Sequence, residues 1–181
     1  MTRIEQLAGA KHEEISALLD TTFGPDRHAR TAYRIRLGMA WLTDLSFAAL
    51  DEAGALIGSL QCWPVALHAP DGAQIPLVMV GPVAVQPAVQ HRGIGRALMD
   101  RLIETVDTHP REPLMMIGDP EYYGRFWAFS AEQTAGWSVP GPVERHRLLL
   151  RTSAGLVLPA TGLLGPREVD QALASMENTP G

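Results

Sequence analysis

The sequence predicts a mixed α/β (α+β) domain, built on a mostly antiparallel sheet with a central helical crossover. Two observations carry this prediction: short apolar segments separated by turns between residues 46 and 86, and a strongly amphipathic segment that follows a glycine-rich turn at 90–96. The 181 residues are enough for one such domain with a tail. With 46% hydrophobic and 19% charged residues, the chain has the composition of a folded protein, and its net charge of −5 disfavours general nucleic-acid binding.

The first half of the chain is expected to form a strand, two helices and a three-stranded meander. Helical spacing of apolar residues and the stops at Gly24-Pro25 and Gly38 delimit the helices. Turn residues, including Asp71-Gly72, separate the meander strands. The expected elements are a strand at 4–7, helices at 11–23 and 29–37, and strands at 46–50, 56–65 and 76–86.

The second half continues with helix, strand, helix and two closing strands. The clearest helix starts at Ile94 and has an apolar stripe that ends at Val106. Asp119-Pro120-Glu121 is a strong helix start, with an N-cap acid followed by proline. Strands are expected at 113–118, 137–139 and 147–150. We therefore assign residues 1–151 to the domain and 152–181 to a C-terminal extension, with a possible helix at 167–176 whose apolar face would dock on the domain or on a second subunit.

A glycine-punctuated turn joins the long strand to the clearest helix. Its glycines allow backbone N–H groups to converge on an anion, and the helix N-terminus adds about half a positive charge. Arg92 and Arg96 can add charge-assisted hydrogen bonds to phosphate oxygens. Two other phosphate motifs are excluded: the dinucleotide fingerprint needs Gly or Ala where this chain has Leu98, and the P-loop lysine is missing, since Lys11 is the only lysine. The turn predicts a phosphate cradle, with a plain strand–turn–helix connection as the alternative.

Three blocks of sequence together resemble one family. They are Gln90-His91-Arg92-Gly93-Ile94-Gly95, which follows the pattern Gln/Arg-x-x-Gly-x-Gly/Ala, then Phe23-Gly24-Pro25-Asp26-Arg27 and Gly118-Asp119-Pro120-Glu121-Tyr122-Tyr123-Gly124-Arg125-Phe126. In their order along the chain, 23–27, 90–95 and 118–126, they are similar to the GNAT superfamily of acetyl-CoA-dependent acyltransferases, and most similar to a branch of mostly uncharacterised bacterial N-acetyltransferases. The resemblance covers about residues 1–151. It implies the GNAT fold, a mixed sheet with flanking helices in which a central strand splays from its parallel neighbour, here expected at 114–117.

The resemblance also implies where acetyl-CoA would bind as a co-substrate, with no metal. The pantetheine would pair with the backbone of Val83, Ala84 and Val85 in the splayed strand. The sequence itself supports the splay, because proline has no N–H and Gly81-Pro82 therefore predicts a bulge. The pyrophosphate would bind the turn and the first helical residues, namely Gln90, His91, Arg92, Gly93, Ile94, Gly95, Arg96 and Ala97.

A tyrosine is the implied general acid that would protonate the departing thiolate. Tyr123 matches this position when the register is counted forward from Gly118. Counted backward from the family's terminal Gly-Phe, the register fails, because Trp127-Ala128-Phe129 is one residue longer and an alanine replaces the glycine. Tyr122 is therefore the alternative catalytic residue, and a packing role for Tyr123 stays open.

The acceptor side of the site is less defined by the sequence. Arg27 and His28 fall where GNAT proteins line the acceptor pocket, and a surface loop is an equal reading. The general base is unassigned. We expect an N-acetyltransferase that transfers the acetyl group to a primary amine of a small molecule or peptide, by direct attack in a ternary complex. The alternatives are a catalytically inactive CoA-binding regulatory module and a protein acyltransferase whose tail recruits its substrate.

The composition and the positions of the prolines also indicate the cellular compartment and the kinds of partner. Cys62 is the only cysteine, so no internal disulfide can form, and a buried thiol in a reducing compartment is expected. Charged residues interrupt the N-terminus, where a secretory signal would be apolar. Prolines divide the weakly charged stretch 52–92 into short strands, which disfavours a membrane span. We expect a cytoplasmic protein with no nucleic-acid or membrane partner, and a homodimer is possible.

Overall fold

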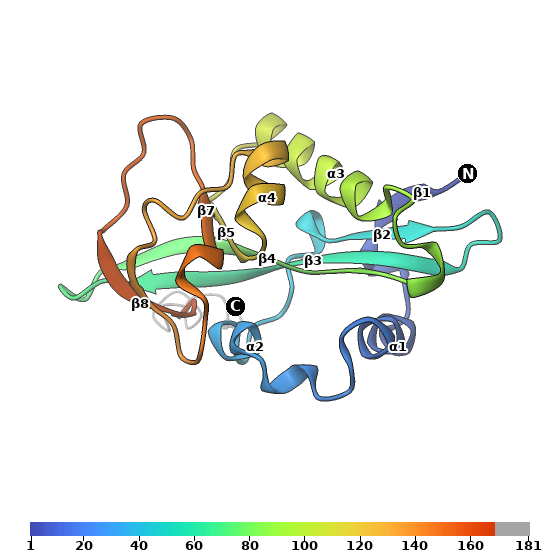
Figure 1. Cartoon of the computed structure of the whole chain (residues 1–181), viewed down its shortest axis with the longest axis horizontal. Coiled ribbons are helices and arrows are strands. Elements are labelled where there is room, and N and C mark those ends of the chain that lie inside the picture. Colours follow the sequence, from blue (N-terminus) through green and yellow to red (C-terminus); the bar gives the residue numbers. More distant parts are fainter. Residues whose placement is uncertain (169–181) are drawn as a thin grey trace, which may run out of the picture.

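The structure, a computed structural model, describes residues 1–168 and contains a mixed eight-stranded sheet (Figure 1). Its strands are β1 Arg3–Gln6, β2 Phe47–Leu50, β3 Leu56–His68, β4 Gln74–Val85, β5 Leu114–Ile117, β6 Gly136–Ser138, β7 Leu148–Arg151 and β8 Thr161–Pro166. The main path runs β1-β2-β3-β4-β5-β7, and β8 pairs with β3 and β6. Within this part of the chain only the β4–β5 and β6–β8 pairs are parallel. The predicted fold class, a mostly antiparallel mixed sheet with helices, is confirmed.

In the described part of the chain, four α-helices cover the two faces of this sheet (Figure 1). Helices α1 (His12–Phe23) and α2 (Thr31–Ile35) lie on one face, and α3 (Ile94–Thr108) and α4 (Pro120–Trp127) lie on the other. Helix α3 begins after Gly93, which has the left-handed conformation, and its buried stripe packs on β2, β3 and β4. Helix α4 begins where Asp119 accepts a hydrogen bond from the Glu121 amide, as its sequence predicts.

A bulge in β4 changes which side chains face α3. The pairing with β3 shifts by one residue, so that Leu60 pairs with Val83 but Cys62 pairs with Val80. Before the bulge Val80 faces the core under α3, and after it Val83 faces the same core, although the two positions differ by an odd number. The extra residue lies at Gly81-Pro82, where the sequence predicts a bulge.

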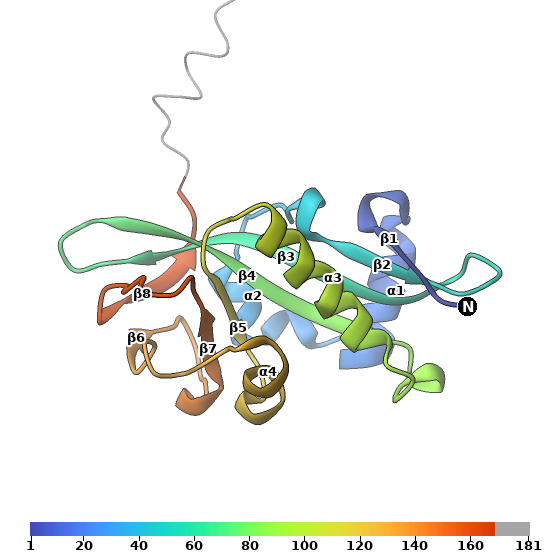
Figure 2. The ribbon, with the colours of Figure 1, turned by 90° about the horizontal axis from the view of Figure 1, so that it is seen from above.

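Strands β4 and β5 separate soon after they pair (Figure 2). Their parallel register covers only Val78 with Leu114 and Met79 with Met115, whereas β4 runs on to Val85. From the bulge onward β4 has no strand partner on its β5 side among the described residues. This is the splayed central strand that the sequence predicts.

One helix differs from the sequence-based expectation. Helix α2 is shorter than 29–37, because Arg30 is extended and separates it from a 3₁₀ turn at Arg27–Ala29. The two closing strands are present and have different partners: β6 pairs with β8, and β7 pairs with β5.

Strand β8 lies in the C-terminal extension, where no strand was expected. Its Gly162 allows close packing, since a Cβ there would lie 2.7 Å from Leu67 Cδ1. This glycine of the extension thus serves strand contact. The possible helix at 167–176 lies outside the described residues, apart from its first two positions, which are not helical.

Two further expectations concern the burial of the single cysteine and the presence of a membrane-spanning segment. Cys62 is fully buried, as predicted, and burial raises the pKa of its thiol. Among residues 1–168, no helix has the length and apolar character that crossing a membrane requires.

Candidate functional site

The turn before α3 presents a run of free backbone amides. A 3₁₀ turn at Pro87–Val89 leads into it, and His91 and Gly93 have positive φ angles of 65° and 77°. Within the described chain, no amide from His91 to Arg96 donates a hydrogen bond, and Ala97 is the first to do so, to Gly93 O at 2.9 Å. Successive free N–H groups at a helix start form a concave anion site.

The side chains of this turn surround the amide run differently. Arg92 is exposed and makes no hydrogen bond or ion pair within residues 1–168. Arg96 lies 4.4 Å over the Phe126 ring and 3.8 Å from Asp100, so α4 and α3 hold its guanidinium. Gln90 donates from its amide to Val85 O at 3.2 Å, which ties the turn to the end of β4. The turn is therefore anchored on the splayed strand.

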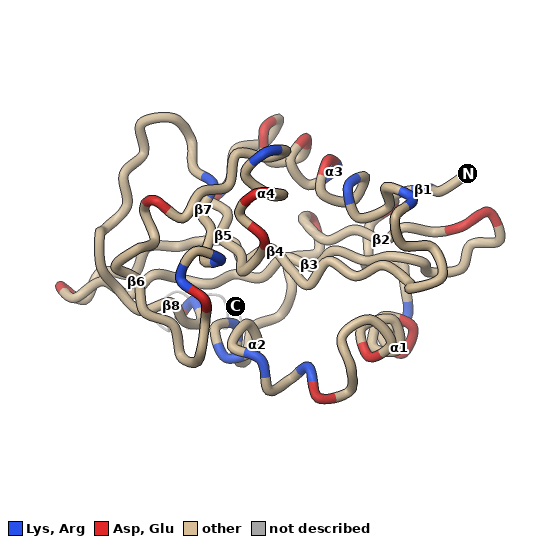
Figure 3. Tube along the Cα trace, viewed as in Figure 1, with Lys and Arg blue, Asp and Glu red and all other residues tan. Residues whose placement is uncertain are grey.

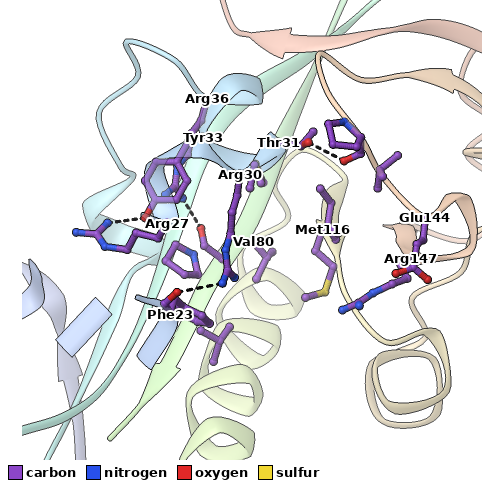
Figure 4. Close-up of a pocket in the computed structure, with 18 of the residues that line it drawn as sticks. Phe23, Arg27, Arg30, Thr31, Tyr33, Arg36, Val80, Met116, Glu144 and Arg147 are labelled. Atoms are coloured by element: carbon purple, nitrogen blue, oxygen red, sulfur yellow. Dashed lines mark hydrogen bonds between the residues drawn. The ribbon is translucent and has the colours of Figure 1, made fainter. Parts of the chain in front are cut away.

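A pocket of about 510 Å³ opens at the separation of β4 and β5 (Figure 4). Its floor is β4 around the bulge, including Val80 and Val83, and the β5 residue Met116. The segment around α2 forms one wall and the segment that leads into β7 forms the other. Tyr123 from α4 also lines it, so the pocket reaches from the α2 side through the sheet to the α4 side.

Tyr123 enters this pocket, whereas Tyr122 does not line it. The Tyr123 ring packs on Gly118, where a Cβ would lie 2.7 Å from Cε2, so only glycine leaves room for the ring. Burial, and next the nearby Tyr122, raise the pKa of Tyr123 to about 12, although Arg147 opposes this. The Tyr123 hydroxyl has no hydrogen-bond partner in the described chain. Its proton is therefore retained at neutral pH and its hydroxyl is available to a ligand.

The segment Trp127-Ala128-Phe129, which is one residue longer than the family pattern, lies at the C-terminal end of α4. Ala128 ends the helix in the left-handed conformation, with φ of 59°, and its amide donates to Gly124 O at 3.1 Å. The extra residue therefore follows the tyrosines and leaves their helical register unchanged. Tyr122 is partly exposed and packs edge-on against Phe126 and Trp127.

Two side chains hold the Gly81 carbonyl at the bulge. Arg36 donates to it at 2.8 Å and the Trp63 indole at 2.9 Å. The Arg36 guanidinium lies between the Tyr33 and Trp63 rings, 4.1 Å from each centroid. Burial lowers the pKa of Arg36 to about 10, so the group stays charged at neutral pH. A buried cation thus fixes the wall of the pocket.

The structure separates the two acceptor-side candidates. Arg27 lines the pocket, but it is buried and its donors are engaged by Asp20 at 2.8 Å, by Tyr33 and by Ser16. His28 lies outside the pocket lining and packs edge-on against Tyr33 at 4.8 Å. The 3₁₀ turn at Arg27–Ala29 directs successive side chains differently, which explains the separation.

Charged side chains in the pocket are unevenly distributed. Basic residues lie around α2 and on the segment that leads into β7 (Figure 3). Glu144 is the one carboxylate that lines the described pocket, and no cluster of three or more His, Cys, Asp or Glu that could hold a metal occurs within residues 1–168.

Comparison with known proteins shows which class of protein this fold and site define. Residues 3–127 match the family model described as acetyltransferase (GNAT) domain, and the chain belongs to that family. A curated relative, the uncharacterized N-acetyltransferase YhbS of Escherichia coli, is 29% identical over 112 residues, which are 62% of this chain. The chain spans 64% of the length of that relative.

Solved structures show the same fold. The crystal structure of YhbS from Escherichia coli in complex with CoA superposes with a TM-score of 0.67 and 23% identity, over 92% of this chain and 89% of that chain. A GNAT family acetyltransferase from Brucella melitensis in complex with acetyl-CoA gives a TM-score of 0.57 and 22% identity, over 90% and 93% of the two chains.

Sequence reasoning missed several side chains of the pocket. Arg30, Arg36 and Arg147 lie in segments without a motif, and their meeting depends on the packing of α2 and of the segment before β7 against β4. One local signal was present. Tyr33 and Arg36 are three residues apart, a spacing that brings side chains together on a helix.

Proposed function

We propose that this protein is an acetyl-CoA-dependent N-acetyltransferase that transfers the acetyl group to a primary amine by direct attack in a ternary complex. The observation that carries the proposal is the pocket that passes between β4 and β5 to Tyr123. It would give an amine on the α2 side direct access to a thioester bound on the side of α3 and α4. The neighbours crystallised with CoA and with acetyl-CoA support this choice of donor.

The described residues fit the donor chemically. The free amides from His91 to Arg96 suit a pyrophosphate, and Arg92 is free to pair with a phosphate oxygen. The unpaired edge of β4 after the bulge suits the amides of pantetheine, which would pair with the backbone near Val83, Ala84 and Val85. Gly95 packs beside the Val83 and Val85 side chains, which keeps the pyrophosphate and pantetheine sites adjacent.

In the reaction the amine nitrogen forms a bond to the thioester carbonyl carbon, and the C–S bond then breaks. The amine loses one proton and the departing thiolate gains one. Tyr123 would donate that proton from its hydroxyl and regain one from solvent or from the amine. The raised pKa of Tyr123 makes it a weaker acid, but the same burial also destabilises a thiolate next to it, which offsets this effect.

The pocket also favours the reactive form of the amine. Attack requires a neutral amine, and positive groups nearby disfavour the ammonium form. Arg36 is buried beside the bulge and stays charged at neutral pH. This cation reduces the need for a dedicated base, and none is assigned.

The test is CoA-thiol release from acetyl-CoA across a panel of primary amines, with the acetylated product identified by mass spectrometry. We expect sustained turnover that depends on both substrates and intersecting initial-rate patterns, as a ternary complex requires. Tight acetyl-CoA binding without turnover of any amine would instead identify a CoA-binding regulatory module. Parallel initial-rate patterns would contradict direct attack.

A further inference from the structure

Arg147 is an exposed cation that lines the pocket. It lies just before β7, and its side chain extends toward Met116 (Figure 4). Within the described chain its guanidinium makes no hydrogen bond, ion pair or cation–π contact. An arginine that only stabilises the fold would be expected to engage a carboxylate or carbonyl, as Arg27 does with Asp20.

Arg30 faces the pocket from the opposite wall, just before α2 (Figure 4). One of its terminal nitrogens donates to Phe23 O at 3.1 Å, and its other donors contact no acceptor within residues 1–168. This single bond orients the guanidinium and leaves its other N–H donors free. Two arginines from different elements therefore present free donors to one cavity.

The remaining charges do not neutralise these two arginines. Asp20 compensates Arg27, whereas Arg36 is held by aromatic rings and a carbonyl. Glu144 is largely exposed, its carboxylate lies 3.6 Å from the His146 ring, and it forms no ion pair with Arg30 or Arg147 within residues 1–168. The pocket wall thus presents two exposed, uncompensated arginines on the side from which an acceptor would enter.

We propose that the acceptor amine carries an anionic group, a carboxylate or a phosphate, which binds Arg147 and is flanked by Arg30. This inference rests on the proposed function and names its substrate class. Arginine suits both anions because its planar donors match two oxygens at once. Binding of the anion by Arg147 leaves the amine of the same molecule to reach the gap between β4 and β5. Polyamines and lysine-rich peptides would meet the same cations as like charges.

The experiment compares matched amines at saturating acetyl-CoA. One arm pairs amino acids with their carboxamides, and the other pairs aminoalkyl phosphates with the corresponding amino alcohols, with rates expressed per neutral amine. We expect kcat/KM to favour the anionic member by roughly 10- to 100-fold, the range of a hydrogen bond to a charged group. The arm with the larger ratio identifies carboxylate or phosphate.

Arg147→Gln tests the assignment to a residue. We expect KM for the anionic member to rise by about tenfold, with the neutral member and acetyl-CoA affinity changing by less than about twofold. Arg34→Gln is the matched control, because Arg34 is an exposed arginine of α2 outside the pocket lining. It removes the same charge and should keep the preference.

Three outcomes would overturn the inference while leaving the proposed function intact. They are a preference for neutral or cationic amines, an unchanged preference in Arg147→Gln, and a loss of acetyl-CoA affinity in that variant in place of the acceptor effect. If no amine is acetylated, the proposed function fails and calorimetry decides the inference. If the anionic member binds CoA-saturated wild-type protein and this binding is lost in Arg147→Gln, the inference is upheld. If the anionic and the neutral member bind equally, the inference is overturned.

Discussion

At the scale of single residues, Tyr123 is the side chain on which the proposed chemistry depends most. Tyr123→Phe keeps the ring packed on Gly118 and removes only the hydroxyl. We expect turnover to fall by about 10²–10⁴, the usual contribution of general acid catalysis, with acetyl-CoA affinity nearly unchanged. Because its pKa is raised to about 12, the phenol keeps its proton at pH 9–10, and the wild-type rate should show no decline there from ionisation of Tyr123.

Tyr122→Phe is the matched control for that substitution. Tyr122 lies outside the pocket lining and packs against Phe126 and Trp127. Its loss of a partly exposed hydroxyl should leave turnover within a few-fold of wild type. A large loss in Tyr122→Phe with near-normal Tyr123→Phe would exchange the two roles, and normal turnover in both would mean that water protonates the thiolate.

Arg36 gives a second prediction at this scale, on stability and pocket shape. Arg36→Lys keeps a positive charge but loses the planar group between Tyr33 and Trp63 and the geometry of its bond to Gly81 O. We expect a loss of about 1–3 kcal/mol in the free energy of unfolding, from chemical denaturation, and a higher KM for the acceptor amine. Arg34→Lys, on the same helix, should change neither, and equal stability of both variants would contradict the role given to Arg36.

At the scale of elements, the phosphate-binding role of the turn before α3 can be tested by a substitution that adds a negative charge and keeps the fold. A Cβ at Gly95 would lie 3.7 Å from Val85 Cγ2, an ordinary contact, and no positive φ is required there. Gly95→Ala should therefore fold and retain acetyl-CoA binding, whereas Gly95→Asp should fold but lose it, because a carboxylate beside the amide run would repel the phosphates. Calorimetric titration with acetyl-CoA measures both. Unchanged affinity in Gly95→Asp would refute the cradle.

Elements with strong local signals were predicted well from the sequence. Apolar periodicity and caps defined α1, α3 and α4, and Gly81-Pro82 correctly predicted the bulge and the splay of β4. Strand β8 was missed because its pairing partner β3 lies about a hundred residues away, and its glycines resemble those of a linker. Local pattern carries no information on such a distant pair.

In the candidate site, too, residues within contiguous motifs could be predicted from the sequence, and residues from separate segments could not. The amide run and Tyr123 lie in contiguous motifs and were found from the sequence. The arginines that give the pocket its charge lie before α2, in the residue that follows α2 and before β7, and only the folded sheet brings them together. Sequence therefore identified the donor side of the proposed site better than its acceptor side.

At the scale of the whole molecule, β8 links the segment after Thr152 to the domain. It pairs with β3, buries Leu164, and is followed by Arg167, which donates to Leu77 O and contacts Glu112 at 2.9 Å. Truncation after Thr152 should lower the free energy of unfolding by more than about 3 kcal/mol relative to a chain that ends at Glu168. Thermal unfolding and light scattering of the two chains measure stability and subunit number. Equal melting temperatures would show that β8 contributes little.

The bulge in β4 also limits what can be inferred from relatives of this chain. Deleting one residue at Gly81-Pro82 would restore regular pairing with β3, but it would turn Val83 and Val85 away from α3 and bring the buried Ala84 toward it. The apolar core under α3, which now contains Val83 and Val85, and the core on the opposite face, which contains Ala84, would then receive side chains of the wrong size. The irregular strand is thus required by packing before any thioester binds. A relative that has lost catalysis would be under the same constraint, so the bulge in a homologous sequence is evidence of ancestry and architecture, and not of enzymatic activity.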